Sequence, residues 1–189
     1  MDIVKKNDVS KIAKIFLIAL LGTLLLTLSA KIKIPFYPVP MTMQTFMVLF
    51  IGITLGSKVG LFTVSLYLLE GIIGLPVFAN SPEKGVGLLY FTGPTMGYLI
   101  GFLFSVYLVG SFKFEDSFKD VSKIFKNFFK LLIAVSFIYL LGLLWLGFII
   151  GWDKPIIHIG ALPFLPAELF KILILAIIVG PLKRIKKIT

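Results

Sequence analysis

Long apolar stretches alternate with short polar or proline-rich connections along the whole chain. The apolar stretches run over 12–30, 42–55, 59–73, 94–110, 128–150 and 164–180. All but the second and third approach the length of about 20 residues that a helix needs to cross the hydrocarbon core of a bilayer. The pattern predicts a bundle of six transmembrane helices, in which neighbouring helices shield the two short ones.

The composition also predicts a membrane environment. Hydrophobic residues make up 58% of the chain and charged residues 15%, whereas an ordinary soluble domain carries about 25% charged residues. The 189 residues include no polar segment long enough for a second folded unit. We therefore predict a single all-α integral membrane domain over 1–189. Because the chain has no Cys, disulfides and thiolate metal sites are excluded.

The net charge of +10 comes from basic residues that flank the apolar stretches. Lysines precede the first stretch, fill the connection over 113–130 and end the chain, whereas the connections on the other side carry only Lys31, Lys33, Lys84 and Lys154. Since basic residues collect on the cytoplasmic side of membrane proteins, we predict that both termini are cytoplasmic. The basic residues form no recognition module, which argues against nucleic-acid binding.

The connections on the outer side are rich in proline, glycine and aromatic residues. They are the segments 31–40, 74–80 and 151–163. Proline fixes the backbone angle φ and glycine permits tight turns, so these residues favour ordered loops over loose tethers. We expect the outer loops to roof a ligand cavity at the outer membrane boundary.

Glu168 and Lys171 lie one helical turn apart within the last apolar stretch. A charged residue at the centre of a spanning helix costs roughly 2.5 to 3.5 kcal/mol on insertion scales. A spacing of three residues places both side chains on one helix face, where they pair with each other or hold a ligand between them. The pair is therefore the first candidate binding site, with a purely structural ion pair as the alternative.

Further polar residues fall near the outer ends of the predicted helices. Gln44, Asn80 and Tyr98 lie in apolar and aromatic surroundings, a mixture that suits a small ligand but equally suits side chains that bond neighbouring backbone. Glu70 fits a side chain that extends to the outer boundary. The only His, His158, lacks partners at metal-ligand spacing, and the chain has neither a Walker A loop nor a catalytic set. We predict no metal, no cofactor and no enzymatic activity.

Small residues recur at every fourth position in two places. Glycines occupy this spacing in 93–101, and Ala19, Thr23 and Thr27 repeat it in the first stretch. Such spacing lets helix backbones approach closely in lipid. For the first stretch, the sequence leaves open whether the close neighbour is a partner protein or another helix of the same bundle.

Four blocks in order, 39–45, 67–78, 93–102 and 162–171, resemble the BioY family, the biotin-specific substrate-binding S components of energy-coupling factor (ECF) transporters. The resemblance implies a multi-pass protein of the cell membrane that binds biotin with high affinity at its outer face. It implies a separate energising module made of a transmembrane coupling subunit and two ATPases. It also assigns docking to that subunit to small residues of the first helix, here Ala19, Thr23 and Thr27.

The resemblance extends to the binding residues. We expect the ureido group of biotin to find partners among Asn80, Glu168 and Lys171, or Lys171 to bind the valerate carboxylate instead. The family usually has Gly-Asp where this chain has Ala167 and Glu168. Other functions stay open: an S component for another vitamin, a small lipid-modifying membrane enzyme, or a purely structural membrane subunit.

Overall fold

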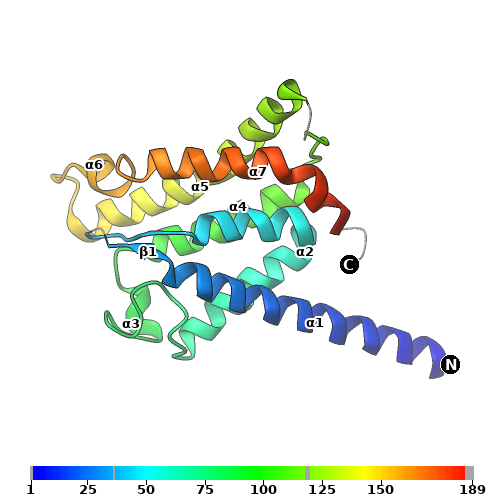
Figure 1. The fold of residues 1–189 in the computed structure, drawn as a ribbon. Helices are drawn as coiled ribbons and strands as arrows, with labels where there is room; N and C mark the ends of the chain where they lie inside the picture. The colour runs from blue at the N-terminus through cyan, green and yellow to red at the C-terminus, as the bar shows by residue number, and fades with distance from the viewer. Residues whose placement is uncertain (1, 36, 118–119, 186–189) are drawn as a thin grey trace.

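The computed structural model describes the backbone of residues 2–35, 37–117 and 120–185 (Figure 1). Within these ranges it describes the burial and contacts of the side chains of residues 10–182. Lys119, Lys186 and Lys187, which contribute to the predicted charge pattern, lie outside the described residues. The elements in chain order are α1 (Asp2–Lys31), β1 (Lys33–Ile34), β2 (Met41–Thr42), α2 (Gln44–Ile72), α3 (Leu88–Phe91), α4 (Met96–Ser111), α5 (Val121–Ile150), α6 (Ile156–Gly160) and α7 (Leu165–Ile185).

Helices contain all the predicted apolar stretches, to within two residues at their ends. The structure has 4 helices, or parts of them, that are long and apolar enough to cross a membrane, namely Ser10–Lys31, Gln44–Ile72, Val121–Ile150 and Leu165–Leu182, and α4 is a shorter apolar helix. Helix α5 begins well before the predicted residue 128, because Asp120 caps it by accepting hydrogen bonds from the backbone N–H groups of Ser122 (3.0 Å) and Lys123 (3.3 Å).

Helix α2 is broken at Gly56, between the second and third predicted stretches. Gly56 has φ 78° and ψ 179°, which interrupts the helix and suits glycine far better than any other residue. The two arms, 44–55 and 57–72, fold back on each other at this point (Figure 1). A side-chain atom added to Gly60 would lie 3.6 Å from Cα of Gly52 in the other arm. The sequence therefore predicted both arms and the break between them.

Close packing of α4 on its neighbours confirms one predicted role of small residues. An added Cβ on Gly101 would lie 2.6 Å from Cα of Ile138 in α5, and one on Gly97 would meet the backbone of Leu141. Helix α4 therefore approaches α5 at backbone distance, as the glycine spacing predicted. Gly93 differs, because it precedes α4 and its added Cβ would meet only the carbonyl oxygen of Tyr90.

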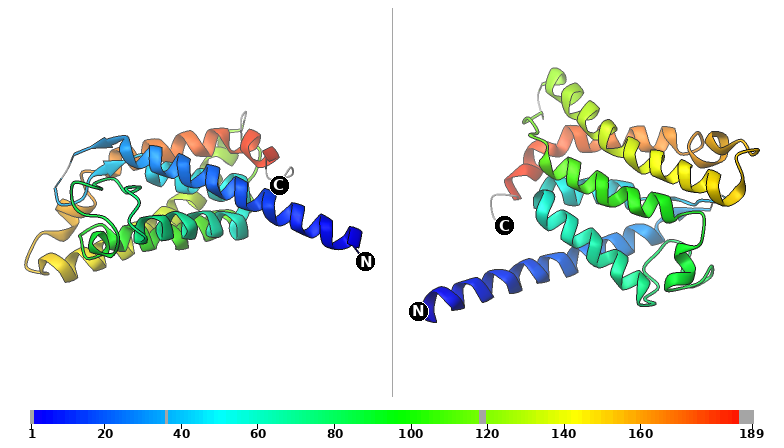
Figure 2. Two further views of the ribbon diagram at one scale, coloured as in Figure 1. Left: turned by 90° about the horizontal axis from the view of Figure 1, so that it is seen from below. Right: turned by 180° about the vertical axis from the view of Figure 1, so that it is seen from behind.

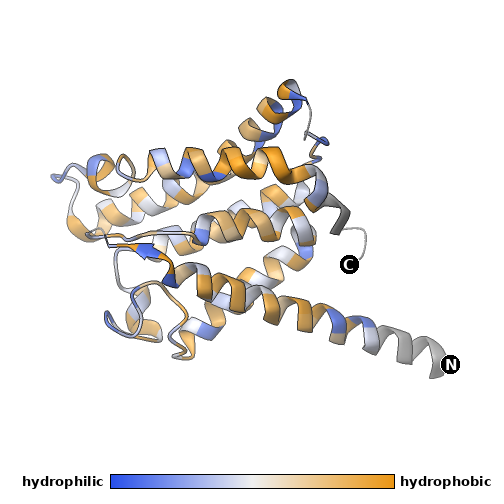
Figure 3. Cartoon of the chain, viewed as in Figure 1, coloured by the Kyte–Doolittle hydropathy of each residue, from blue (hydrophilic) through white to orange (hydrophobic). Residues whose placement is uncertain are grey.

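The two ends of the bundle differ in structure. The start of α1 and the end of α7 lie at one end, whereas the β1–β2 pair, α3 and α6 lie at the other (Figures 1 and 2). The sequence did not predict the β1–β2 hairpin, in which two antiparallel strands of 2 residues each align Lys33 with Thr42. Apolar residues dominate the long helices, and polar residues gather in the connections (Figure 3). We call the end with the hairpin the loop end.

Candidate functional site

The predicted pair Glu168 and Lys171 forms a buried ion pair on α7, near the loop end. Lys171 Nζ lies 2.6 Å from Glu168 Oε1, and both side chains are almost fully buried. The spacing of three residues places them on one face of the first turns of α7. Because two charges so placed are costly to desolvate, their remaining hydrogen-bonding groups need partners.

Strand β2 and the first turn of α2 supply those partners. Lys171 Nζ also donates to the carbonyl oxygen of Thr42 (2.6 Å) and to Thr45 Oγ1 (3.1 Å). The Thr45 hydroxyl in turn donates to Glu168 Oε1 (2.8 Å). An ammonium group has three N–H donors, and in this structure all three have an acceptor. Lys171 therefore has no donor left for a ligand unless one of these bonds breaks.

Glu168 differs from Lys171 in this respect. Its Oε1 atom accepts from Lys171 and from Thr45, but its Oε2 atom is buried and has no hydrogen-bond partner among the described residues. A buried acceptor without a donor costs about 1–3 kcal/mol, and more when it is charged. The site is therefore short of one hydrogen-bond donor, at Glu168 Oε2.

A small cavity of about 60 Å³ lies beside Glu168, between the hairpin, α2, the connection from α2 to α3, α3, α4, α5 and α7. Its lining is mainly apolar and aromatic, with a few polar residues: Val39, Pro40, Met41, Thr42, Gln44, Thr45, Ala79, Tyr90, Thr95, Tyr98, Leu99, Phe102, Ile138, Tyr139, Phe164 and Glu168. Residues from seven parts of the chain meet here. An apolar wall with few polar groups is typical of a small-molecule site.

Gln44 and Tyr98, predicted as binding residues, both line this cavity, but their polar groups already have partners. Gln44 Nε2 donates to the hydroxyl of Tyr67 (2.8 Å). The Tyr98 hydroxyl donates to the carbonyl oxygen of Gly160 (2.8 Å) and so ties α4 to α6. The ring of Tyr98 meets that of Tyr139 edge to face, with centroids 6.0 Å apart. Tyr98 therefore offers a ligand its ring rather than its hydroxyl.

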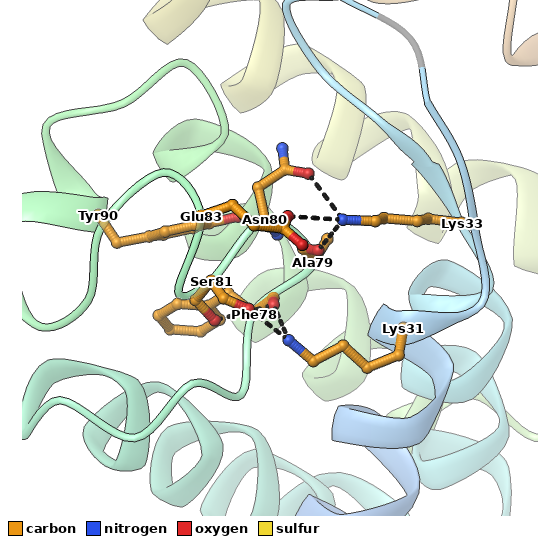
Figure 4. Close-up of polar contacts among 8 residues, drawn as sticks. All are labelled: Lys31, Lys33, Phe78, Ala79, Asn80, Ser81, Glu83 and Tyr90. Atoms are coloured by element: carbon orange, nitrogen blue, oxygen red, sulfur yellow. Dashed lines mark hydrogen bonds and ion pairs between the residues drawn. The ribbon is translucent and has the colours of Figure 1, made fainter.

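Asn80 does not line the cavity, whereas its neighbour Ala79 does. The side-chain oxygen of Asn80 instead accepts from Lys33 Nζ (3.3 Å), and Lys31 Nζ contacts the same loop (Figure 4). Tyr90 follows in α3, and burial raises the pKa of its hydroxyl above the ordinary value, so that the group is neutral. The structure thus brings Asn80 near the site without directing its amide into the cavity.

The small-residue stripe of α1 packs inside the bundle. Ala19 is 0% exposed and Thr23 is 2% exposed. The Thr23 hydroxyl donates to Glu70 Oε1 in α2 (2.9 Å), and the Thr27 hydroxyl donates to the carbonyl oxygen of Thr23 (2.9 Å). In this conformation Thr23 contacts α2, and both Ala19 and Thr23 are buried, so that a partner protein cannot reach them. Glu70, expected to extend to the boundary, is hydrogen-bonded to α1.

Several cavity residues carried no signal in the sequence. Thr45 follows Gln44 in a helical run, and nothing local indicates that its hydroxyl bonds residues more than a hundred positions away. Tyr139 lies within a long apolar stretch, where a residue typically faces the lipid or packs in the core of the bundle. His158, the only His in the sequence, is exposed on α6.

The fold and the cavity together define a helical membrane protein with a small, mainly apolar cavity at one end of its bundle. The chain belongs to the BioY family, whose family model matches residues 4–187.

Relatives of known name agree with this assignment. A biotin transporter BioY from Thermotoga maritima is 35% identical over 165 residues, which cover 87% of this chain and 92% of that protein. A probable biotin transporter BioY from Pyrococcus horikoshii is 32% identical, with 85% of this chain and 90% of that protein covered. With these relatives, the apolar helices identify a multi-pass protein of the cell membrane.

A solved structure shares the fold. The crystal structure of the S-component for biotin from an ECF-type ABC transporter superposes with a TM-score of 0.74 at 28% sequence identity and covers 93% of each chain. The relatives are transporters by name, and the structural neighbour is a transport component.

Proposed function

We propose that this chain is the substrate-specific S component of an ECF-type transporter and binds biotin for uptake across the cell membrane. Membership of the BioY family, the names of the relatives and the similarity to a solved biotin S-component all support this function. No bond of biotin is made or broken in this function, since the chain only captures the vitamin and releases it.

The hydrogen bonds of Glu168 and Lys171 indicate which end of biotin lies beside them. Among the described residues, Glu168 Oε2 is a buried acceptor without a donor, and Lys171 has already used its three donors. The ligand must therefore bring an N–H or O–H group to Glu168. The ureido ring of biotin carries two N–H groups, whereas its carboxylate would be repelled by Glu168. Biotin thus enters with the ureido ring toward Glu168 and the valerate chain toward the loop end.

The aromatic lining provides for the rest of the ligand. The rings of Tyr98, Tyr139 and Phe102 and the side chain of Leu99 line the cavity and suit the apolar bicyclic body of biotin. The present volume of about 60 Å³ has room for a few water molecules. Side chains of the lining therefore rearrange on binding, and flexible Met41 is well suited to do so.

The membrane arrangement follows from the same proposal. The two arms of α2 count as separate passes, so that α1, both arms of α2, α4, α5 and α7 make six. The Lys-rich end of the bundle lies in the cytoplasm and the loop end outside. A transmembrane coupling subunit and two ATPases supply the energy, as the family resemblance implies.

Calorimetric titration with modified ligands tests the proposed orientation. Biotin methylated on a ureido nitrogen loses a donor to Glu168, so we expect its affinity to fall about ten- to a hundredfold, as for the loss of a hydrogen bond to a charged group. Biotin esterified at the valerate carboxylate should bind within about tenfold of biotin, because that end lies toward the opening. The reverse order of affinities would show that the carboxylate is the inner end.

Titration with unrelated vitamins tests the specificity itself. Saturable binding of biotin and none of the others is expected. A response to another vitamin without one to biotin would show that the chain is an S component of different specificity. Wild-type affinity in both Glu168→Ala and Lys171→Ala would show that the ion pair is structural only.

A further inference from the structure

Residues 77–81, in the connection between α2 and α3, have no regular secondary structure. Even so, each of their backbone carbonyl oxygens accepts a hydrogen bond from another residue. We call 77–81 the braced segment. The hydroxyl of Tyr67 in α2 donates to the carbonyl oxygen of Val77 (2.9 Å). Lys31, the last residue of α1, donates through Nζ to the carbonyl oxygens of Phe78 (2.8 Å) and Ser81 (2.7 Å).

Lys33 in β1 completes this set of contacts. Its Nζ atom donates to the carbonyl oxygen of Ala79 (2.8 Å) and to Asn80 Oδ1 (3.3 Å), and it lies 3.2 Å from Glu83 Oε2 (Figure 4). The remaining carbonyl, that of Asn80, accepts from the backbone N–H of Lys84 (2.7 Å). The two ammonium groups therefore hold the braced segment from the side of α1 and the hairpin.

The braced segment forms one wall of the ligand cavity. Ala79 lines the cavity directly. The ring of Phe78 stacks on that of Tyr90, with centroids 4.7 Å apart, and Tyr90 also lines the cavity. The backbone N–H of Asn80 donates to the Tyr90 hydroxyl (3.4 Å). A shift of the braced segment would thus move two parts of the wall at once.

The contacts to carbonyl groups carry more weight than the ion pair. The side chain of Glu83 is 70% exposed, so its pairing with Lys33 contributes little. The carbonyl groups belong to irregular backbone beside an apolar bundle, where unpaired acceptors are costly. Each ammonium group makes charge-assisted hydrogen bonds to these acceptors, and such bonds are stronger than neutral ones.

We propose that Lys31 and Lys33 are positioning residues of the ligand site, which hold the braced segment against the cavity and thereby slow ligand dissociation. This inference rests on the proposed function, because the ligand is taken to be biotin. Neither lysine lines the cavity. The two residues act on the ligand through Ala79 and Tyr90.

Release of labelled biotin, chased with an excess of unlabelled biotin, tests the inference in wild type and in Lys31→Met and Lys33→Met. Met keeps an unbranched apolar chain but removes the charge and the donors. We expect each variant to release biotin about tenfold faster than wild type, or more, from the loss of charge-assisted hydrogen bonds. The matched control is Lys154→Met, since Lys154 pairs only with exposed, adjacent Asp153 in the described part of the chain. Its release rate should stay within about twofold of wild type.

Rescue separates positioning from a general structural role. Lys33→Arg keeps the charge and several donors, and should restore slow release where Lys33→Met does not. If a Met variant does not fold, the Gln variant at the same position, too short to reach the same acceptors, is measured instead. Release rates that match wild type in the variants at both positions would overturn the inference, even if their thermal unfolding midpoints fall. Failure of wild type itself to bind biotin would overturn the proposed function as well.

Discussion

Substitution of Thr45 by Val removes a single hydroxyl from the centre of the site and leaves its shape nearly unchanged. That hydroxyl donates to Glu168 Oε1 (2.8 Å) and accepts from Lys171 Nζ (3.1 Å). Hydrogen bonds between membrane helices average about 0.6 kcal/mol, which gives about 1 kcal/mol for two. Bonds to charged groups reach about 3 kcal/mol. We therefore expect a loss of about 1–3 kcal/mol in the free energy of unfolding.

The hydroxyl also holds the carboxylate of Glu168 in place for the ligand. Without it, Glu168 is fixed by Lys171 alone, so we expect the affinity for biotin to fall about tenfold, which corresponds to about 1.4 kcal/mol. Thermal unfolding of the purified protein measures the stability, and calorimetric titration measures the affinity. For a protein of this size, the expected loss of stability lowers the unfolding midpoint by about 3–10 °C.

Thr54→Val is the matched control in the same arm of α2. Thr54 is also buried, at 3% exposed, but its hydroxyl donates only to carbonyl oxygens of its own helix, at Phe50 (2.8 Å) and Ile51 (3.4 Å). This substitution should lower the midpoint by less than half as much and leave the affinity unchanged. Equal effects of Thr45→Val and Thr54→Val on both quantities would refute the reasoning.

Three further substitutions test the packing and the ligand contacts. Gly101→Leu should destabilise the protein by about 1–3 kcal/mol in thermal unfolding, because its side chain would meet Cα of Ile138 and force α4 away from α5; an unchanged midpoint would contradict that contact. Tyr98→Phe should cost about 1 kcal/mol of stability through the bond to Gly160 but leave biotin affinity within about threefold, and complete loss of binding would show that the hydroxyl contacts the ligand. Glu168→Asp should weaken binding in titration, because the shorter side chain cannot reach both Lys171 and the ligand, and full affinity would show that the pocket adapts.

The sequence predicted the helices well because hydrophobicity is a local signal. The apolar runs gave the two arms of α2, and their gap fell at Gly56, where glycine allows the break. The ends of the helices were less accurate. Helix α5 starts at Val121 rather than at 128, since its first turns are basic and extend beyond the apolar run, and the capping signal at Asp120 was overlooked.

The candidate site was predicted only as far as residues close in sequence reveal it. The spacing of Glu168 and Lys171 predicted their pairing, which the structure confirms. The third member, Thr45, comes from another helix, and only the tertiary fold brings it to the pair. In the same way, Lys31 and Lys33 served as topology markers in the sequence, whereas their bonds to carbonyl groups some fifty residues away exist only in the fold.

Calorimetric titration of wild type and Glu168→Gln with biotin, side by side, tests the central claim most directly. Gln keeps the size of the side chain, but its amide has a single oxygen, which Lys171 and Thr45 would hold. An NH2 donor would then stand where a ureido N–H would meet Oε2. We expect saturable binding by wild type and a loss of affinity of about ten- to a hundredfold in the variant, as for the loss of a hydrogen bond to a charged group. Biotin affinity in a folded Glu168→Gln variant equal to that of wild type would contradict the assignment of Glu168 as the acceptor for the ligand.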